Sequence, residues 1–199
     1  MRFSKLYSLL LGLIVVACNF KAEPLQLKES RVLDDAIIVS SDSLILNRLS
    51  GEVFYRGLPF TGTGITQYPD GSRASSIEYY QGKKHGLYRK WFANASLSYE
   101  ANYVEGKLRG ESRSWWRNGK LRTLSNFKEG VPDGEQLQYY KSGLLFKKLQ
   151  LAMGKESGLQ QSWRENGKLF NNYEAKDGRI YGLKRSKLCF QLEEEGLEY

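Results

Sequence analysis

The sequence has very few of the residues that build metal centres and nucleophilic active sites. Of its 199 residues one is histidine and two are cysteine, so no histidine cluster is available to hold zinc. The carboxylates are scattered along the chain, unlike the paired acids of a glycosidase. His85 occupies a loop position that equivalent loops fill with arginine, aspartate, serine or tyrosine. We therefore expect no enzymatic activity, no cofactor and no metal site.

Long hydrophobic runs are also missing, except for one at the start of the chain. Residues 6–16 are apolar and follow the positive Arg2 and Lys5. A run this short does not reach the ~20 residues that span a bilayer, but it suits a secretory signal peptide. The alternative is an ordinary buried N-terminal helix, although no polar face interrupts the run. We expect residues 1–17 to be a signal peptide.

The end of this run, Val15-Val16-Ala17-Cys18, resembles the bacterial lipobox. The resemblance implies that Cys18 is lipidated and becomes the new N-terminus. Asn19, rather than an aspartate, follows Cys18, and in the family that this resemblance implies, such a residue favours the outer membrane. Both the periplasmic and the surface side of that membrane stay open. One acyl chain gives only marginal binding, so a multiply acylated cysteine would anchor the protein stably. The protein is thus expected to be exported and tethered to the cell envelope.

The remaining chain is basic and holds one further cysteine. Without Arg2 and Lys5 it carries 28 Lys+Arg against 22 Asp+Glu, a balance of +6 that favours anionic neighbours. Lipid headgroups, a surface polysaccharide or an acidic protein fit; an exported protein rarely meets nucleic acid. With Cys18 lipidated, Cys189 has no partner in the chain. It is either a small apolar residue of the last strand or a reactive free thiol.

The most informative feature is a repeat of 24 residues. Glycine recurs with this step in three columns, interrupted only by Ala95. The columns are Gly82, Gly106, Gly130, Gly154 and Gly178; Gly62, Gly86, Gly110, Gly134, Gly158 and Gly182; and Gly71, Ala95, Gly119, Gly143 and Gly167. Complete units span 82–105, 106–129, 130–153 and 154–177, with partial copies at about 57–81 and 178–190. Such a period indicates a repeat array.

Each unit reads as a β-hairpin. Dipeptides such as Asn118-Gly119 between apolar and aromatic residues are a strong hairpin signal, and glycine allows the positive φ of the turn. A two-residue loop there places Trp116 opposite Leu121, and Gly110 opposite Phe127. With Ala95, the turn of the second unit is expected to be strained or wider. The predicted fold is all-β, an elongated single-layer meander of stacked antiparallel hairpins.

Strand alternation then gives the sheet two aromatic faces. The first face carries Tyr68, Phe92, Trp116 and Tyr140, backed by Leu97, Leu121, Leu145 and Leu169, together with Tyr79, Tyr103 and Phe127 opposite glycines. The second face carries Trp91, Trp115, Tyr139 and Trp163 with Arg89, Arg113 and Arg122. In this register Trp115 and Arg122 are neighbours, so a cation–π contact is expected. Either both columns pack the sheet, or the second face is a binding surface, because Trp with Arg is typical of interface hot spots.

The units resemble the MORN-repeat variant, including bacterial proteins described as YwqK-type antitoxins. The resemblance rests on Gly-Lys-x-x-Gly, the aromatic pair, Asn-Gly-Lys-Leu, and Pro59-Phe60-Thr61-Gly62. It implies a non-enzymatic interaction or envelope scaffold module for an unknown protein or an anionic polysaccharide. The alternative is an antitoxin-type protein that neutralises a partner, which a neighbouring toxin gene would favour. The lipobox argues against a cytoplasmic toxin as that partner, because an exported protein would not meet it.

The expected organisation of the chain has five parts. A signal peptide (1–17) precedes a membrane tether (18–31) and a capping segment (32–56), in which two short apolar runs are expected to form a hairpin. The repeat array (57–190) and an acidic C-terminal tail (191–199) follow.

Overall fold

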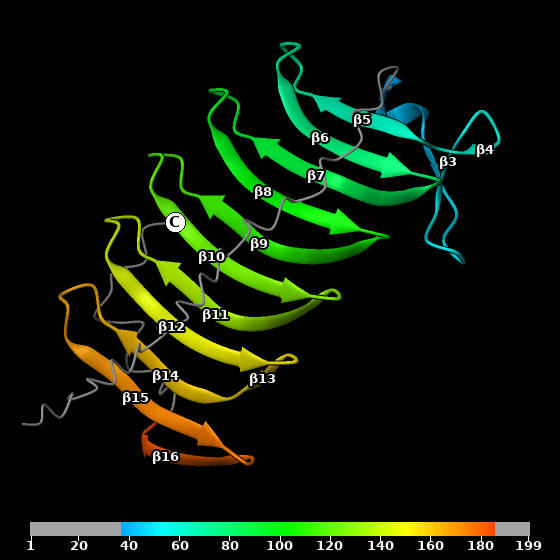
Figure 1. Ribbon diagram of the computed structural model, residues 1–199. Coiled ribbons are helices and arrows are strands. Elements are labelled where there is room, and N and C mark those ends of the chain that lie inside the picture. The colour runs from blue at the N-terminus through cyan, green and yellow to red at the C-terminus, as the bar shows by residue number, and fades with distance from the viewer. Residues whose placement is uncertain (1–36, 186–199) are drawn as a thin grey trace, which may run out of the picture. The chain divides into compact units, whose positions relative to one another are not determined.

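The computed structural model describes residues 37–185, which are dominated by one sheet of thirteen strands. From β5 to β16 the strands lie side by side in chain order and pair antiparallel with their neighbours, except that the short β13 and the following β14 both pair with β12 (Figure 1). They are β5 (Gly62–Gln67), β6 (Arg73–Tyr80), β7 (Lys83–Trp91), β8 (Leu97–Val104), β9 (Lys107–Trp115), β10 (Leu121–Lys128), β11 (Val131–Tyr139), β12 (Leu145–Ala152), β13 (Lys155–Glu156), β14 (Gly158–Trp163), β15 (Leu169–Lys176) and β16 (Arg179–Leu183). The predicted meander of stacked hairpins is confirmed.

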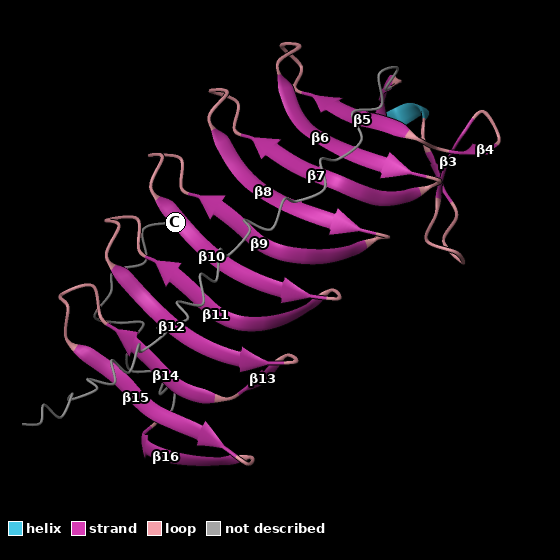
Figure 2. Cartoon of the chain, in the orientation of Figure 1, coloured by secondary structure: helices cyan, strands magenta, loops and turns pink. Residues whose placement is uncertain are grey.

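Helical structure is almost absent from the described part of the chain (Figure 2). Residues 37–185 hold one short 3₁₀ helix, η1 (Ser41–Ser43), and no helix with the length and apolar character to cross a bilayer. Cys18, Cys189, the predicted signal peptide, tether and tail lie outside the described residues.

Two kinds of turn alternate along the array. At one edge, which we call the return edge, a two-residue turn joins successive strands. Between β8 and β9, Val104 pairs with Lys107, and the residues between them have φ of 50° (Glu105) and 83° (Gly106). Two consecutive left-handed residues define the type I′ turn, whose twist matches that of the strands. The same pattern occurs at Arg56-Gly57, Gln81-Gly82, Glu129-Gly130, Met153-Gly154 and Asp177-Gly178.

At the opposite edge the Asn-Gly turns are wider than predicted. The backbone N–H of Trp116 donates to the Lys120 carbonyl, and that of Gly119 donates to the Trp116 carbonyl, both at 2.9 Å. Three residues therefore lie between Trp116 and Lys120, and only Gly119 among them is left-handed, with φ of 79°. This is the type I turn followed by a left-handed glycine, so the predicted two-residue loop is wrong. We call these loops the wide turns; they are residues 68–72, 92–96, 116–120, 140–144 and 164–168.

In the wide turns at residues 116–120 and 164–168, the asparagine before the glycine closes the loop with its side chain. The Oδ1 of Asn118 accepts a hydrogen bond from the Lys120 backbone at 3.1 Å, and Asn166 does the same for Lys168 at 3.0 Å. Ala95 follows the same plan: its N–H donates to the Phe92 carbonyl at 2.9 Å, and its φ is 61°. The second turn is therefore not wider than the others, and the strain falls on the backbone of Ala95.

The wide turn shifts the strand register by one residue, and a bulge then restores it. Trp115, not Trp116, lies opposite Leu121, whereas Ser114 lies opposite Thr123, which leaves Arg122 as the extra residue. Beyond the bulge Gly110 lies opposite Phe127, as predicted. The other pairs of this kind are Trp91 with Leu97, Tyr139 with Leu145, and Trp163 with Leu169. The leucine column therefore shares the second face with the tryptophans, which corrects its assignment to the first face.

The N-terminal cap is not the hairpin expected from its two apolar runs. β1 (Ile38–Ser40) adds to the sheet parallel to β5, whereas β2 (Ile45–Leu46) joins a separate small sheet with β3 (Val53–Tyr55) and β4 (Leu58–Pro59). η1 lies between the two runs, and each run belongs to a different sheet. By pairing with β5, β1 covers an edge that would otherwise expose unpaired backbone groups.

The apolar core is small and lies at this capped end. Val53, Phe60 and Tyr79 are buried together, and the Phe60 and Tyr79 rings lie 5.7 Å apart. The Val53 N–H donates to the Gly82 carbonyl at 2.7 Å, and the Gly82 N–H donates to the Phe60 carbonyl at 2.7 Å. These bonds join the small sheet to the first complete repeat.

Along the repeats, several buried positions hold polar side chains, and two buried glutamines satisfy backbone groups. Gln160 is fully buried, and its Nε2 donates to the carbonyls of Gln150 at 2.6 Å and Gly158 at 3.3 Å. One unit earlier, Gln136 donates to the Asn126 carbonyl at 2.8 Å. The left-handed Gly134 and Gly158 interrupt the strand ladder nearby, so the glutamine amides satisfy backbone groups left free there.

Candidate interaction surface

The second face of the sheet carries a regular apolar column, which we call the Trp–Leu ladder. It consists of Trp91, Trp115, Tyr139 and Trp163 with their cross-strand partners Leu97, Leu121, Leu145 and Leu169. Strand alternation repeats it in the hairpins from β7 to β15, whereas the β5–β6 hairpin has Gln67 opposite Arg73 at this position. None of the eight side chains is buried; the four aromatic rings are half-buried, and Leu169 is 45% exposed. The ladder is therefore not core within the described residues.

The arginines predicted beside this column do not form a row of free cations. Arg89 lies 2.7 Å from Glu100 in an ion pair, and Arg113 pairs with Glu111 on the same strand. These acids neutralise the two arginines that share the face with the tryptophans. The structure thus brings Arg89 and Arg113 beside the column as predicted, but each of them is paired with an acid.

Arg122 makes a different contact from the one predicted. Its guanidinium carbon lies 4.6 Å from the ring centroid of Trp116, a cation–π contact. The expected contact with Trp115 is wrong, because the bulge at Arg122 removes it from the simple alternation on which that expectation rested.

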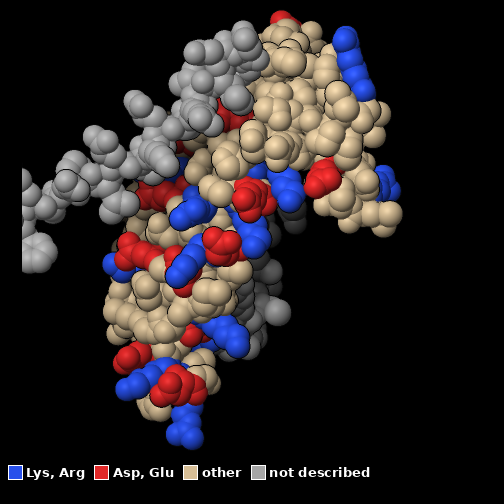
Figure 3. All heavy atoms as spheres, turned by 45° about the vertical axis from the view of Figure 1, so that its right-hand side comes forward, with Lys and Arg blue, Asp and Glu red and all other residues tan. Residues whose placement is uncertain are grey.

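The return edge carries charges of both signs. Acidic and basic side chains alternate on the side of the molecule that Figure 3 brings forward. On this edge Lys107 forms an exposed ion pair with Glu129 at 3.4 Å. Such a mixed surface attracts neither polyanions nor polycations strongly.

The first face is built around tyrosines on β7 and β8. The ring of Tyr88 lies 5.5 Å from that of Tyr99 and 6.2 Å from that of Tyr103. Lys84 lies over Tyr88 and Tyr103, at 5.6 and 5.2 Å from the centroids. Burial, together with the neighbouring Tyr103, raises the pKa of Tyr99 to about 12. This packing agrees with the structural role predicted for the first face.

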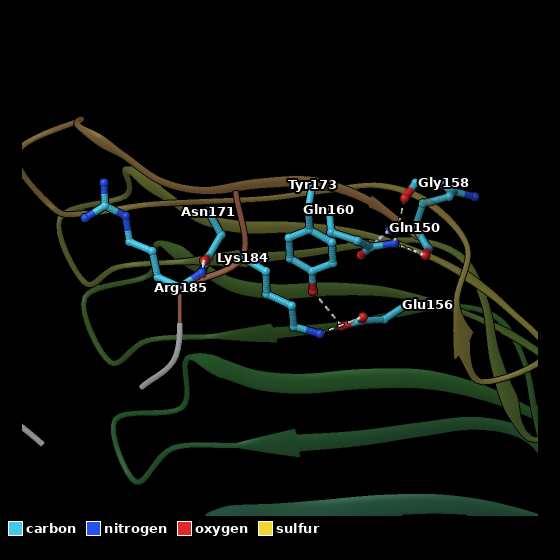
Figure 4. Close-up of polar contacts among 8 residues, drawn as sticks. All are labelled: Gln150, Glu156, Gly158, Gln160, Asn171, Tyr173, Lys184 and Arg185. Atoms are coloured by element: carbon cyan, nitrogen blue, oxygen red, sulfur yellow. Dashed lines mark hydrogen bonds and ion pairs between the residues drawn. The ribbon is translucent and has the colours of Figure 1, made fainter. Parts of the chain in front are cut away.

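At the other end of the first face, polar side chains from four strands surround a hollow of about 340 Å³ (Figure 4). The Tyr173 hydroxyl donates to Glu156 at 2.8 Å, and Lys184 Nζ lies 3.3 Å from the same carboxylate. Burial raises the pKa of Tyr173, and its hydrogen bond to Glu156 acts in the same direction. Sequence reasoning missed this cluster, because Glu156 has no acidic counterpart in the other repeats.

His85 is exposed, and its Nδ1 accepts only a long hydrogen bond, 3.5 Å, from the backbone of Glu105. Residues 37–185 contain no group of three histidine, cysteine, aspartate or glutamate side chains arranged to hold a metal ion.

Comparison with known proteins identifies the repeat. Residues 108–129 match the MORN repeat variant, and this segment is one wide-turn hairpin, β9 with β10. A search of curated proteins found no match to the chain. The neighbouring hairpins have the same turns, the same bulge and the same cross-strand pairs as the matched segment. Residues 108–129 are therefore similar to a MORN repeat variant, and the described array repeats the hairpin of this segment.

Proposed function

We propose that the protein is a non-enzymatic lipoprotein, anchored to the cell envelope through Cys18, whose repeat array is an interaction module. The MORN repeats support a binding or scaffold role. The lipobox-like Val15-Val16-Ala17-Cys18 supports the anchor.

The observation that carries the binding role is the Trp–Leu ladder. Eight large apolar side chains line one face of the sheet, and none of them is buried within the described residues. Aromatic side chains with apolar neighbours and a polar rim are typical of the centre of protein interfaces. The ion pairs of Arg89 and Arg113 supply that rim. A partner protein is thus expected to cover the ladder.

The anchor is tested by fatty-acid labelling. Wild-type protein should incorporate labelled palmitate, and Cys18→Ala should remain unlabelled and lose its membrane association. Absence of label from the wild type, or label that survives the substitution, would overturn the lipoprotein assignment.

The ladder is tested by site-specific photo-crosslinking in intact cells. A photoreactive residue at Leu169, which is 45% exposed on the ladder, should capture a defined partner protein. The matched control is Met153, which is 61% exposed on a return turn. If both positions capture the same proteins equally, or neither captures any, the ladder is not the contact surface.

A further inference from the structure

The wide turns of the last three hairpins concentrate positive charge along one edge of the sheet. Residues 116–122, 140–146 and 164–170 hold six cations and one carboxylate, Glu165, a balance of +5. The corresponding residues of the first two hairpins, 68–74 and 92–98, hold only Asp70 and Arg73, a balance of zero. The six cations are Arg117, Lys120, Arg122, Lys141, Arg164 and Lys168. We call the three segments the basic edge.

The cations of the basic edge are accessible. All are exposed except Arg164, which is half-buried. Within residues 37–185 none of the six forms an ion pair with a carboxylate, in contrast to Arg89 and Arg113 on the ladder face. Their charge is therefore available to an anionic ligand.

Aromatic rings hold several of these cations in place. Arg117 lies 5.7 Å from the centroid of Phe92, and Lys141 lies 5.8 Å from that of Trp116. In both cases a cation of one wide turn lies over the ring of the preceding turn. Arg164 similarly lies 5.4 Å from the Phe170 centroid. Cations fixed in this way lose little side-chain entropy when a ligand binds.

Hydrogen bonds fix the spacing of the wide turns themselves. Trp116 Nε1 donates to the Tyr139 carbonyl at 3.1 Å, and the Tyr140 hydroxyl donates to the Trp163 carbonyl at 2.9 Å. Asn118 Nδ2 donates to the Lys141 carbonyl at 2.8 Å. Each hairpin contributes two strands, so the three wide turns of the basic edge, each of which holds at least one cation, follow one another about every 9–10 Å.

We propose that the basic edge binds a linear acidic polysaccharide. A row of cation-bearing turns at a constant spacing matches a polymer whose carboxylates or sulfates recur at a constant interval, whereas a folded acidic protein offers no such repeat. Single-stranded nucleic acid is less suitable, because its binders leave aromatic faces free to stack with bases. Here guanidinium and ammonium groups already cover the rings of Phe92 and Trp116. The proposal rests on the interaction role proposed above, but requires neither the lipid anchor nor the ladder.

The test measures binding of the full chain, in detergent, to polygalacturonate, with neutral dextran as the blank. A triple variant, Arg117→Gln with Lys141→Gln and Lys168→Gln, removes one cation from each wide turn of the basic edge. The matched control, Lys83→Gln with Lys128→Gln and Lys176→Gln, removes the same charge from exposed positions near the return edge.

The basic-edge triple should weaken binding about 10- to 100-fold, the sum of three exposed charge contacts, and the control should change it about 2-fold or less. Equal losses in both triples, or no binding of polygalacturonate by the wild type, would overturn the proposal. So would tighter binding of polyglutamate or a single-stranded oligonucleotide, which would assign the edge to a protein or a nucleic acid. None of these outcomes affects the palmitate and crosslinking tests, so failure here is distinguishable from failure of the proposed function.

Discussion

Exchanging glycine and alanine between two equivalent wide turns should move stability in opposite directions. Ala95 and Gly119 occupy the same position in consecutive repeats, with φ of 61° and 79° and the same hydrogen bonds. Ala95→Gly should relieve left-handed strain in the second repeat, and Gly119→Ala should introduce it in the third. This pair of substitutions tests backbone strain alone. A Cβ added at Gly119 would meet no atom within 4 Å, so a steric clash cannot contribute to the loss of stability.

The expected magnitude follows from two opposing effects. An L-residue in the left-handed region costs about 1–2 kcal/mol, and glycine costs about 0.5–1 kcal/mol in lost chain entropy. Ala95→Gly should therefore stabilise the fold by about 0.5–1 kcal/mol, and Gly119→Ala should destabilise it by a similar amount. For a chain of this size that corresponds to about 1–4 °C in Tm, up for the first variant and down for the second.

Thermal unfolding followed by circular dichroism checks this pair, with the double variant Ala95→Gly/Gly119→Ala expected near the wild-type Tm. Gly119→Val provides the upper bound, since a β-branched residue at positive φ should cost about 1–3 kcal/mol. A lower Tm for Ala95→Gly, or an unchanged Tm for Gly119→Ala, would show that the wide turns do not require a left-handed residue.

Two further outcomes follow from the fold. Deleting residues 106–129 removes one full repeat and joins compatible strands, so it should leave a shorter array that unfolds cooperatively in urea. Deleting residues 106–117 leaves one strand without its hairpin partner and should abolish cooperative unfolding. Equal loss of stability and cooperativity in both variants would contradict the stacked-hairpin arrangement. The pKa of Tyr99 is about 12 in the folded protein but near 10 in the unfolded chain, so the hydroxyl of the unfolded chain loses its proton at lower pH. The free energy of unfolding should therefore fall as the pH rises from about 10 to 12. Tyr99→Phe should reduce this fall, and tyrosinate absorbance that shows Tyr99 titrating at its ordinary pKa would contradict it.

The repeat and the hairpins were predictable because glycine marks every turn except the one at Ala95 at a constant interval. The assignment of turn types to edges was not, because Asn-Gly occurs both in the type I′ turn and in the type I turn with a left-handed glycine. The type I′ turns lie instead at pairs such as Glu105-Gly106, where glutamate gives no such signal. Because the wide turn is one residue longer than predicted, Leu121 was assigned to the wrong face of the sheet. The bulge at Arg122 restores the register, so the pairing of Gly110 with Phe127 was predicted correctly.

The surface was predictable only in its periodic part. Strand alternation correctly grouped Trp91, Trp115, Tyr139 and Trp163 on one face. The ion pairs of Arg89 with Glu100 and of Arg113 with Glu111 depend on acids at positions where most other repeats have none. The neutralisation of these two arginines was therefore not predictable from the repeat. The capping segment lies outside the period, and its division between two sheets depends on tertiary contacts of Val53 and Gly82.

The most direct measurement of the interaction role compares partner capture and stability for Trp115→Ala combined with Trp163→Ala. Because both rings are half-buried, each substitution should cost well below the ~3–5 kcal/mol of a buried tryptophan. The folded double variant should nevertheless lose the partner that a crosslinker at Leu169 captures. If the pair instead costs several kcal/mol per tryptophan, or the variant retains the partner at wild-type level, the ladder packs the fold and is not the binding surface.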